Sequence, residues 1–213
     1  GRAHRIGPGV CVEAQGDAAR AREMLGGFLR DVSKPIILAI ARPIRKKNLR
    51  RLVDAYASDR TLQERANLVV IAGLRDGLEQ GCSERDAVIA DLFDGVDRHD
   101  LWGKVALPRQ HSAQDISDLY ALAAEGGVFC NPAFHEPFGL TLIEAAQAGV
   151  PLVATQSGGP SDILPELGFG ALIDPYDTAS LARGLRDVLM APERELAARR
   201  AQRIARQTYD WTA

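Results

Sequence analysis

Apolar runs and helical patterns alternate along this chain. Short apolar runs bounded by Pro or Gly predict buried strands, and apolar residues spaced three or four apart predict helices. Because each strand is followed by a helix, the pattern predicts an α/β fold with a doubly wound, Rossmann-like parallel sheet. Strands are expected at 36–41, 67–72, 103–107, 128–130, 151–154 and 171–173, and helices starting near 49, 84, 115, 141, 177 and 193.

Length, charge and cysteine usage narrow the class of protein. With 213 residues, of which 46% are hydrophobic, the chain is expected to bury one core as a single α/β domain. A net charge of −2 gives no general attraction to nucleic acid or to an anionic membrane. No apolar run approaches the roughly 20 residues that span a bilayer. Cys11, Cys82 and Cys130 are scattered without a C-x-x-C pair, which favours a cytoplasmic protein and argues against a zinc site.

The loops that follow the predicted strands concentrate the unusual chemistry. In parallel sheets, ligands bind outside the carboxyl ends of the strands. The loops expected at that edge are 42–48, 73–77, 108–113, 131–140 and 155–160. No aspartate cluster in the sequence indicates a metal held by the protein.

Two glutamates in one of these loops are the leading candidates. Pro137 and Gly139 keep a helix from reaching back to Glu136, so this carboxylate is expected on a loop. A buried helix is predicted from Thr141, and its first turn offers free N–H groups and a positive dipole end that suit a phosphate. Glu144 would then lie one turn in, within reach of hydroxyl groups on the same ligand. By spacing alone, surface glutamates are the simpler interpretation.

Basic residues and a glycine mark two further loops. Arg42 ends the first strand before Pro43, and Lys47 precedes a helix that we expect Asn48 to cap. An arginine fork and a lysine point charge at one sheet edge could hold a diphosphate. Charge alone favours a solvated turn, since basic residues are dense here. Gly73, which follows the second strand, would by itself be a tight turn.

Several segments together resemble the retaining glycosyltransferases of the GT-B type, family 4. They are "ILAIARPIRKKNL", "LPRQHSAQDISDLYALA", "GVFCNPAFHEPFGLTLIEAAQAGVPLVAT" and "GGPSDIL". The sequences of these segments are most similar to those of the sucrose-phosphate synthases and related sucrose-forming enzymes of that family. The resemblance covers nearly the whole chain and implies the C-terminal, nucleotide-sugar-binding half of a GT-B fold across residues 1–213. It further implies an interdomain linker at 1–12 and, at 193–213, a last helix returning to an absent N-terminal domain.

The resemblance also implies roles for individual residues. The catalytic group would be Glu136, Arg42 and Lys47, with Glu136 on the donor sugar and the two cations on the leaving diphosphate. Glu144 would bind the ribose hydroxyls. The other implied donor-binding positions are Phe138, Gly139 and Leu140 through their backbone amides, Thr141 at the helix start, and Gly73 as pocket lining.

The implied reaction is a retaining transfer of glucose from UDP-glucose to fructose 6-phosphate. The sugar phosphate acceptor would be bound through the N-terminal domain, so this chain alone is expected to bind donor without transferring sugar. No covalently bound cofactor is implied, and Mg is compatible with the diphosphate without being required.

Other functions stay open at this stage. A related glycosyltransferase could use another nucleotide sugar, such as GDP-mannose, or another acceptor, and a non-catalytic nucleotide-binding module is a second class. An NAD-dependent domain is disfavoured because no G-x-G-x-x-G follows the first strand. Backbone contacts and pocket shape select the base and the sugar, so the sequence does not distinguish these donors.

Overall fold

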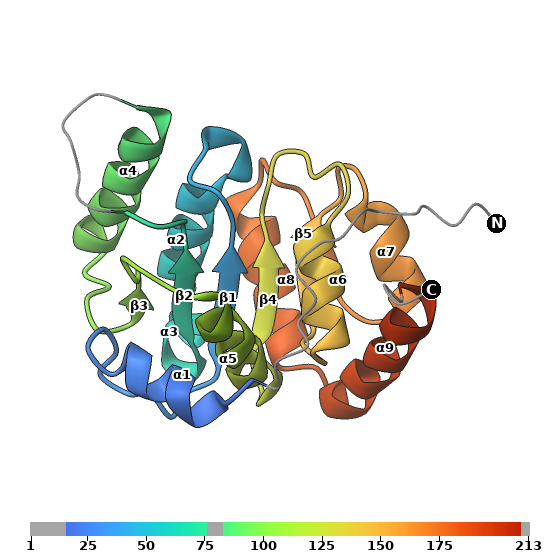
Figure 1. Ribbon diagram of the computed structural model, residues 1–213. Helices are drawn as coiled ribbons and strands as arrows, with labels where there is room; N and C mark the ends of the chain where they lie inside the picture. Colours follow the sequence, from blue (N-terminus) through green and yellow to red (C-terminus); the bar gives the residue numbers. More distant parts are fainter. Residues whose placement is uncertain (1–15, 76–82, 210–213) are drawn as a thin grey trace.

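A six-stranded sheet forms the centre of the molecule (Figure 1). The computed structural model describes residues 16–75 and 83–209. All neighbouring strands pair in parallel, in the order β3-β2-β1-β4-β5-β6, which confirms the predicted fold class. The strands are β1 (Ile36–Ile40), β2 (Asn67–Ile71), β3 (Val105–Ala106), β4 (Val128–Asn131), β5 (Leu152–Thr155) and β6 (Ala171–Ile173).

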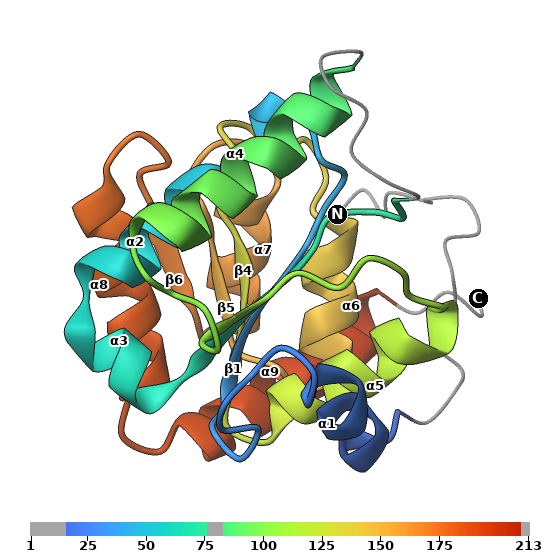
Figure 2. The ribbon, with the colours of Figure 1, turned by 90° about the vertical axis from the view of Figure 1, so that its left-hand side faces the viewer.

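Helices cover both faces of this sheet, as the view along it shows (Figure 2). Along β1, Ile37 and Ala39 join the core of one face, whereas Ile36 and Leu38 join the core of the other. This alternation follows from the period of two in a strand, and it explains why the strand reads as a continuous apolar run. One face carries α2 (Leu49–Ser58), α3 (Arg60–Arg65), α4 (Glu84–Arg98) and α8 (Thr178–Leu189). The other carries α1 (Ala18–Leu25), α5 (Ala113–Ala124), α6 (Leu140–Gln147), α7 (Pro160–Leu167) and α9 (Arg194–Thr208).

Three helices were absent from the sequence-based prediction. The helix α3 has only six residues, too few to display a helical period. In α1, alanines and charged residues leave the apolar stripe weak, although Asp17 caps the helix by accepting from the Ala19 amide. The helix α7 begins at Pro160 and contains Pro165, so its sequence looks like a loop. The strand expected at 103–107 is also shorter, because only Val105 and Ala106 pair with β2.

The expected cap on α2 is wrong. Asn48 has φ 56° and ψ 30°, in the left-handed region, and its side chain makes no capping hydrogen bond. A capping residue needs extended backbone so that its side chain can turn back to the first-turn amides. Here a short 3-10 turn, η1 (Arg45–Lys47), leads directly into the left-handed residue. The Asn48 side-chain amide donates instead to the carbonyls of two residues that are distant in sequence, Pro132 and Pro175.

The helix α9 packs against α6 and α7 with a stripe of small residues. Ala198, Ala201 and Ala205 are its buried residues, and Tyr209 beyond its end donates a 2.6 Å hydrogen bond to Glu166. Through residue 209 the chain therefore lies on this domain. The predicted linker at 1–12, part of the loop 73–77, and the end of the predicted final helix at 210–213 lie outside the described residues.

Strand order locates the crevice of the sheet. From β1 the chain moves outward through β2 and β3, then returns to the other side of β1 for β4, β5 and β6. The order therefore reverses between β1 and β4, and such switch points are where open α/β sheets bind ligands. The loops after β1 and β4 rise side by side at this edge (Figure 1).

Candidate functional site

Three loops are joined at the carboxyl edge of the sheet. The Phe134 amide in the loop after β4 donates to the Lys46 carbonyl in the loop after β1 at 3.0 Å. A bridge between Glu136 and Gly158 ties the loop after β4 to the loop after β5. A Cβ on Gly158, whose φ is +100°, would lie 2.2 Å from the Glu136 carbonyl oxygen, so this close approach requires glycine.

Two of the predicted site residues meet directly in this junction. Glu136 lies on a loop, as predicted, and is 8% exposed. The Lys47 Nζ atom is 2.5 Å from its Oε2 atom. The Asn131 side-chain amide donates to the same oxygen at 3.1 Å, and the Gly139 amide donates to Oε1 at 3.3 Å. The carboxylate is thus held in one orientation by a cation, a side-chain amide and a backbone amide.

The surroundings keep Glu136 ionised. Burial alone would raise the pKa of its carboxyl group. The hydrogen bonds from Lys47 and Asn131, the Lys47 charge and the Gly139 amide outweigh burial, so the pKa lies below its ordinary value. At neutral pH, Glu136 is therefore a fixed hydrogen-bond acceptor.

The beginning of α6 supplies backbone donors next to this carboxylate. Gly139 precedes the helix with φ +82°, and helical bonding starts one residue earlier than predicted, at Leu140. Within the described part of the chain, the amides of Phe138, Leu140 and Thr141 have no acceptor. The Gly139 amide is already bonded to Glu136, so its implied contact with a sugar would compete with that bond.

Glu144 lies one turn into α6, as predicted, and has a partner that the sequence did not reveal. The Tyr120 hydroxyl, from α5, donates to its Oε2 atom at 3.2 Å. Burial raises the pKa of Glu144, although this hydrogen bond acts in the opposite direction. In the sequence analysis, position 120 was only part of the helix expected from about residue 115. The available signal was the hydroxyl group itself, since a buried tyrosine needs a hydrogen-bond partner.

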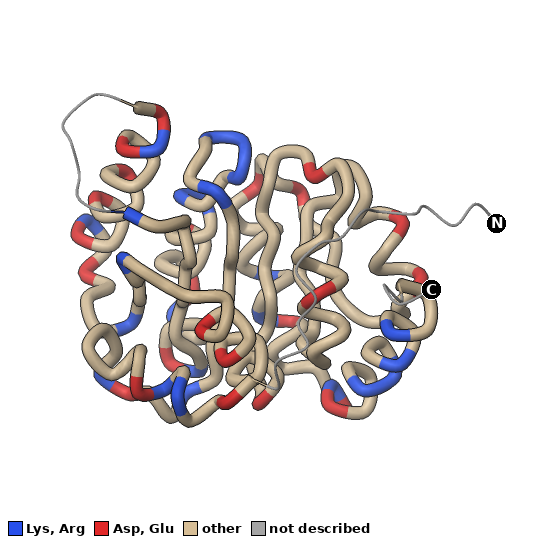
Figure 3. Tube along the Cα trace, in the orientation of Figure 1, with Lys and Arg blue, Asp and Glu red and all other residues tan. Residues whose placement is uncertain are grey.

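Arg42 and Gly73 border the same edge without joining this network. Arg42 is exposed, and its side chain has no ionic or hydrogen-bond partner among residues 16–75 and 83–209. Basic residues of the loop after β1 cluster at the upper edge (Figure 3). Gly73 has φ +70° and packs on Pro43, where an added Cβ would lie 3.4 Å from the Pro43 Cδ atom. The positive φ favours glycine here. Residues 72–75 follow an irregular path without the expected tight turn, and the role of Gly73 in lining a pocket stays a prediction.

This set of groups suits an anionic ligand. The Lys47 ammonium and free helix-start amides lie beside one buried carboxylate, which matches the chemistry of a diphosphate attached to a hydroxylated group. Among the described residues, no group of three His, Cys, Asp or Glu side chains could hold a metal ion. In the same part of the chain, every helix is too short or too polar to cross a membrane.

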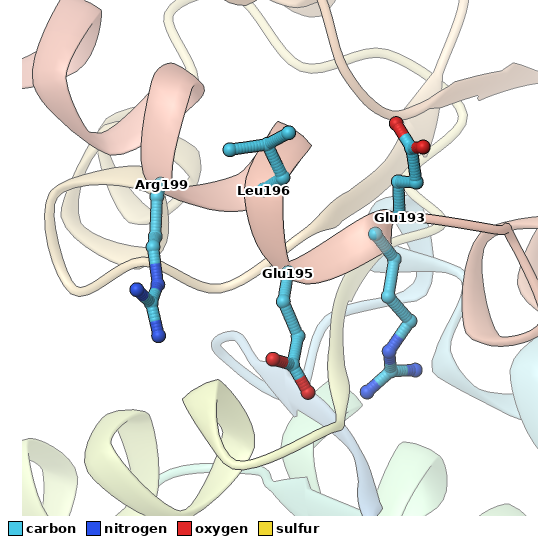
Figure 4. A pocket seen from close by; sticks show the side chains of 5 residues that line it. Glu193, Glu195, Leu196 and Arg199 are labelled. Carbon is cyan, nitrogen blue, oxygen red and sulfur yellow. The ribbon is translucent and has the colours of Figure 1, made fainter.

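A hollow at the start of α9 lies apart from this site. It is lined by residues 193–196 and by Arg199. In Figure 4 the Glu193 side chain points to the opposite side from those of Glu195 and Arg199. The start of α9 lies toward the amino-terminal ends of the strands (Figure 1), and none of the lining residues belongs to the cluster around Glu136.

Comparison with known proteins agrees with this geometry. Residues 23–207 match the family described as glycosyl transferases group 1. The chain belongs to this family. The predicted resemblance to glycosyltransferases is thereby confirmed.

Relatives within this family are sucrose-phosphate synthases. A probable sucrose-phosphate synthase of Vicia faba is 50% identical over 159 residues, which are 74% of this chain and 15% of that protein. The sucrose-phosphate synthase of Spinacia oleracea has the same identity and coverage. The chain thus spans about 15% of the length of these relatives.

Solved structures of glycosyltransferases share the GT-B half that this fold represents. Sucrose-phosphate synthase from Thermosynechococcus elongatus matches with a TM-score of 0.71 and 25% identity, covering 92% of this chain and 46% of that one. Anabaena HepE in complex with UDP-glucose matches with a TM-score of 0.75 and 22% identity, covering 92% and 49%. The second likeness concerns the fold.

The Lys47–Glu136 pair gives a pH-dependent prediction. Lys47→Met should lower the free energy of unfolding at pH 7 by about 1–3 kcal/mol, because it leaves a buried carboxylate without its cation. A carboxyl group with a lowered pKa stabilises the fold above its unfolded value, near 4.5, and loses that contribution as the pH falls through the folded value. The difference between the parent and Lys47→Met should therefore shrink below pH 4.5, as measured by urea denaturation.

Lys46→Met is the matched control, since Lys46 is an exposed neighbour and should change stability little. Adding Glu136→Gln to Lys47→Met should recover part of the loss at pH 7. A stability difference that is the same at pH 7 and at pH 4 would contradict the assigned ion pair.

Proposed function

We propose that this chain is the donor-binding domain of a retaining glycosyltransferase of the sucrose-phosphate synthase type, transferring glucose from UDP-glucose to fructose 6-phosphate. The observation that carries the proposal is the Lys47–Glu136 pair beside the start of α6, at the switch point of the sheet. Support for the substrates comes from relatives that are 50% identical and named sucrose-phosphate synthase. Anabaena HepE, which shares the fold, was solved with UDP-glucose.

In this proposal the diphosphate occupies the positive end of the crevice. Arg42, Lys47 and the free amide of Thr141 at the helix start would surround its oxygens. During transfer, the bond between the anomeric carbon and the phosphate oxygen breaks, and a bond to the acceptor hydroxyl oxygen forms while the hydroxyl proton passes to the departing phosphate oxygen. The departing UDP gains negative charge, which fixed donors stabilise without reorganisation.

Glu136 would receive the sugar at the other side of this crevice. An ionised carboxylate is acceptor-only, so it suits sugar hydroxyl groups. The Lys47 ammonium has three donors, and it could therefore keep its bond to Glu136 while contacting a phosphate oxygen. The ion pair would thus hold both groups ready before the donor arrives, which lowers the cost of ordering them on binding.

Glu144 would bind the ribose hydroxyls between the base and the phosphates. It projects from the same helix whose first turn faces the diphosphate, and Tyr120 holds one of its oxygens. Phe138 and Leu140 would contribute backbone amides to the sugar, Gly139 would do so only in exchange for its bond to Glu136, and Gly73 would line the pocket. Because cations and amides supply the positive charge, the proposed site requires no Mg.

Acceptor binding is proposed for a part of the protein beyond this domain, here the N-terminal domain of the GT-B fold. The chain covers 46% of the Thermosynechococcus elongatus enzyme, consistent with one half of a two-domain fold. Scattered cysteines and a nucleotide-sugar substrate support a cytoplasmic setting. A related enzyme with another nucleotide sugar is the second candidate, and calorimetric titration with UDP, GDP, ADP and their glucose and mannose conjugates distinguishes the two.

Arg42 provides the first test of donor binding. Arg42→Ala should weaken UDP binding roughly 10- to 100-fold, because one charge-assisted hydrogen bond contributes about 1.5–3 kcal/mol. Uridine, which has no phosphates, should bind the parent and the variant alike in calorimetry. Equal losses for uridine and UDP would remove Arg42 from the diphosphate site.

Glu144 provides a test of ribose recognition. Glu144→Gln keeps the side-chain size but weakens the acceptor, so UDP should lose roughly 10-fold in affinity. The same variant should hardly change binding of 2′,3′-dideoxy-UDP, which lacks the partner hydroxyls. If both ligands weaken alike, Glu144 acts on the fold through Tyr120 rather than on the ribose.

Transfer itself should need more than this domain. The 213-residue chain should bind UDP-glucose yet form no sucrose 6-phosphate from UDP-glucose and fructose 6-phosphate in a product assay. A closed cleft is required to keep water from the activated sugar, and one half of the fold cannot close it. Turnover by this chain alone would overturn the proposed division between donor and acceptor domains.

A further inference from the structure

Asn48 joins three loops at the carboxyl edge of the sheet. It is 8% exposed, and its side-chain amide donates to the carbonyls of Pro132 and Pro175, both at 2.9 Å. Pro132 belongs to the loop after β4, and Pro175 belongs to the loop after β6. A single side chain of the loop after β1 therefore uses both of its N–H donors to connect loops that are distant in sequence.

These contacts bracket the ion pair of the site. Asn48 follows Lys47 directly, and Pro132 precedes Glu136 by four residues in the same loop. The Phe134 amide adds a second tie to the Lys46 carbonyl at 3.0 Å. The two bonds involve the residues on either side of Lys47 in the loop after β1, and residues that precede Glu136 in the loop after β4, so they fix the separation between the two loop backbones next to the ion pair.

The loop after β6 makes further contacts with the loop after β4 and with α2. The Phe134 and Tyr176 rings stack with centroids 5.0 Å apart, one from the loop after β4 and one from the loop after β6. Arg51, on α2, donates to the Tyr176 carbonyl at 2.8 Å. Losing the Asn48 side-chain amide would therefore remove one tie from each of two loops.

Two structural requirements limit which residue types fit at position 48. The left-handed backbone, with φ 56°, favours Gly, Asn or Asp over other residues. The two carbonyls additionally require a side chain with two N–H donors, which Gly and Asp lack. Asparagine meets both demands, which explains why this position is not a simple helix cap.

We propose that Asn48 is a positioning residue for donor binding, holding Lys47 against Glu136 so that its ammonium reaches the donor diphosphate. This inference rests on the proposed function of the site. Asn48 acts through Lys47 and touches no substrate itself. Its effect on UDP-glucose affinity therefore depends on the presence of Lys47.

A double-mutant cycle tests this dependence by calorimetry with UDP-glucose. Asn48→Gly keeps the left-handed backbone but removes both hydrogen bonds, and it should weaken UDP-glucose about 5- to 20-fold. In a Lys47→Ala background the same change should cost less than about 2-fold, because no ammonium remains to be positioned. Uridine affinity should stay unchanged in each variant.

Two further variants control the cycle. Asp100→Gly replaces another residue with positive φ, 49°, outside the site, and it should leave UDP-glucose affinity unchanged. Asn48→Asp keeps the side-chain size and tolerates the left-handed backbone, but it turns an acceptor toward two carbonyl oxygens. It should weaken UDP-glucose at least as much as Asn48→Gly, but its charge also repels the diphosphate without Lys47. If the glycine variant does not fold, the cycle is therefore run with Asn48→Ala, which likewise lacks both donors.

The outcomes distinguish the positioning role of Asn48 from the proposed binding of UDP-glucose by this domain. Loss of affinity that is equal with and without Lys47, or no loss in a folded Asn48→Gly variant, overturns the positioning role while leaving donor binding intact. Failure of the parent protein to bind UDP-glucose overturns the proposed function, and the inference with it. A loss confined to the Lys47-containing background supports the role.

Discussion

The ion pair between Lys47 and Glu136 is the contact on which the geometry of this site depends. The two residues are 89 positions apart in the chain, yet their charged atoms lie 2.5 Å from each other at the edge of the sheet. The Lys47 side chain is 18% exposed and that of Glu136 is 11% exposed, so both charges need partners. The loops that carry them are consequently constrained by electrostatics as well as by packing.

The surrounding backbone fits this requirement. Gly158 allows the loop after β5 to touch the Glu136 carbonyl, and Asn48 draws together the loops after β1, β4 and β6. Each of these residues uses a conformation or a donor that most other residues lack. The strands beneath are rigid and apolar, which leaves the loops free to carry the polar chemistry while their ends stay fixed.

The same region contrasts two carboxylates in different environments. The pKa of Glu136 is lowered by its donors in spite of burial, whereas burial raises the pKa of Glu144. Both acids lie at or near the start of one helix, but among residues 16–75 and 83–209 only Glu136 has a cation as partner. This difference is consistent with a charged acceptor for sugar hydroxyls and a more weakly held acceptor for ribose hydroxyls, the roles proposed for them.

The sequence by itself determined the alternating strands and helices, the parallel sheet, the edge where the loops gather, and the positions of Glu136 on a loop and Glu144 on a helix. These follow from local signals, namely apolar periodicity and the backbone limits of Pro and Gly. It failed for α3, which is too short for a period, and for Asn48, whose capping signal was overridden by carbonyls from distant loops. The pairing of Lys47 with Glu136 and of Tyr120 with Glu144 was decided only by the tertiary structure, because strand order and loop contacts bring these residues together across separations that no local pattern encodes.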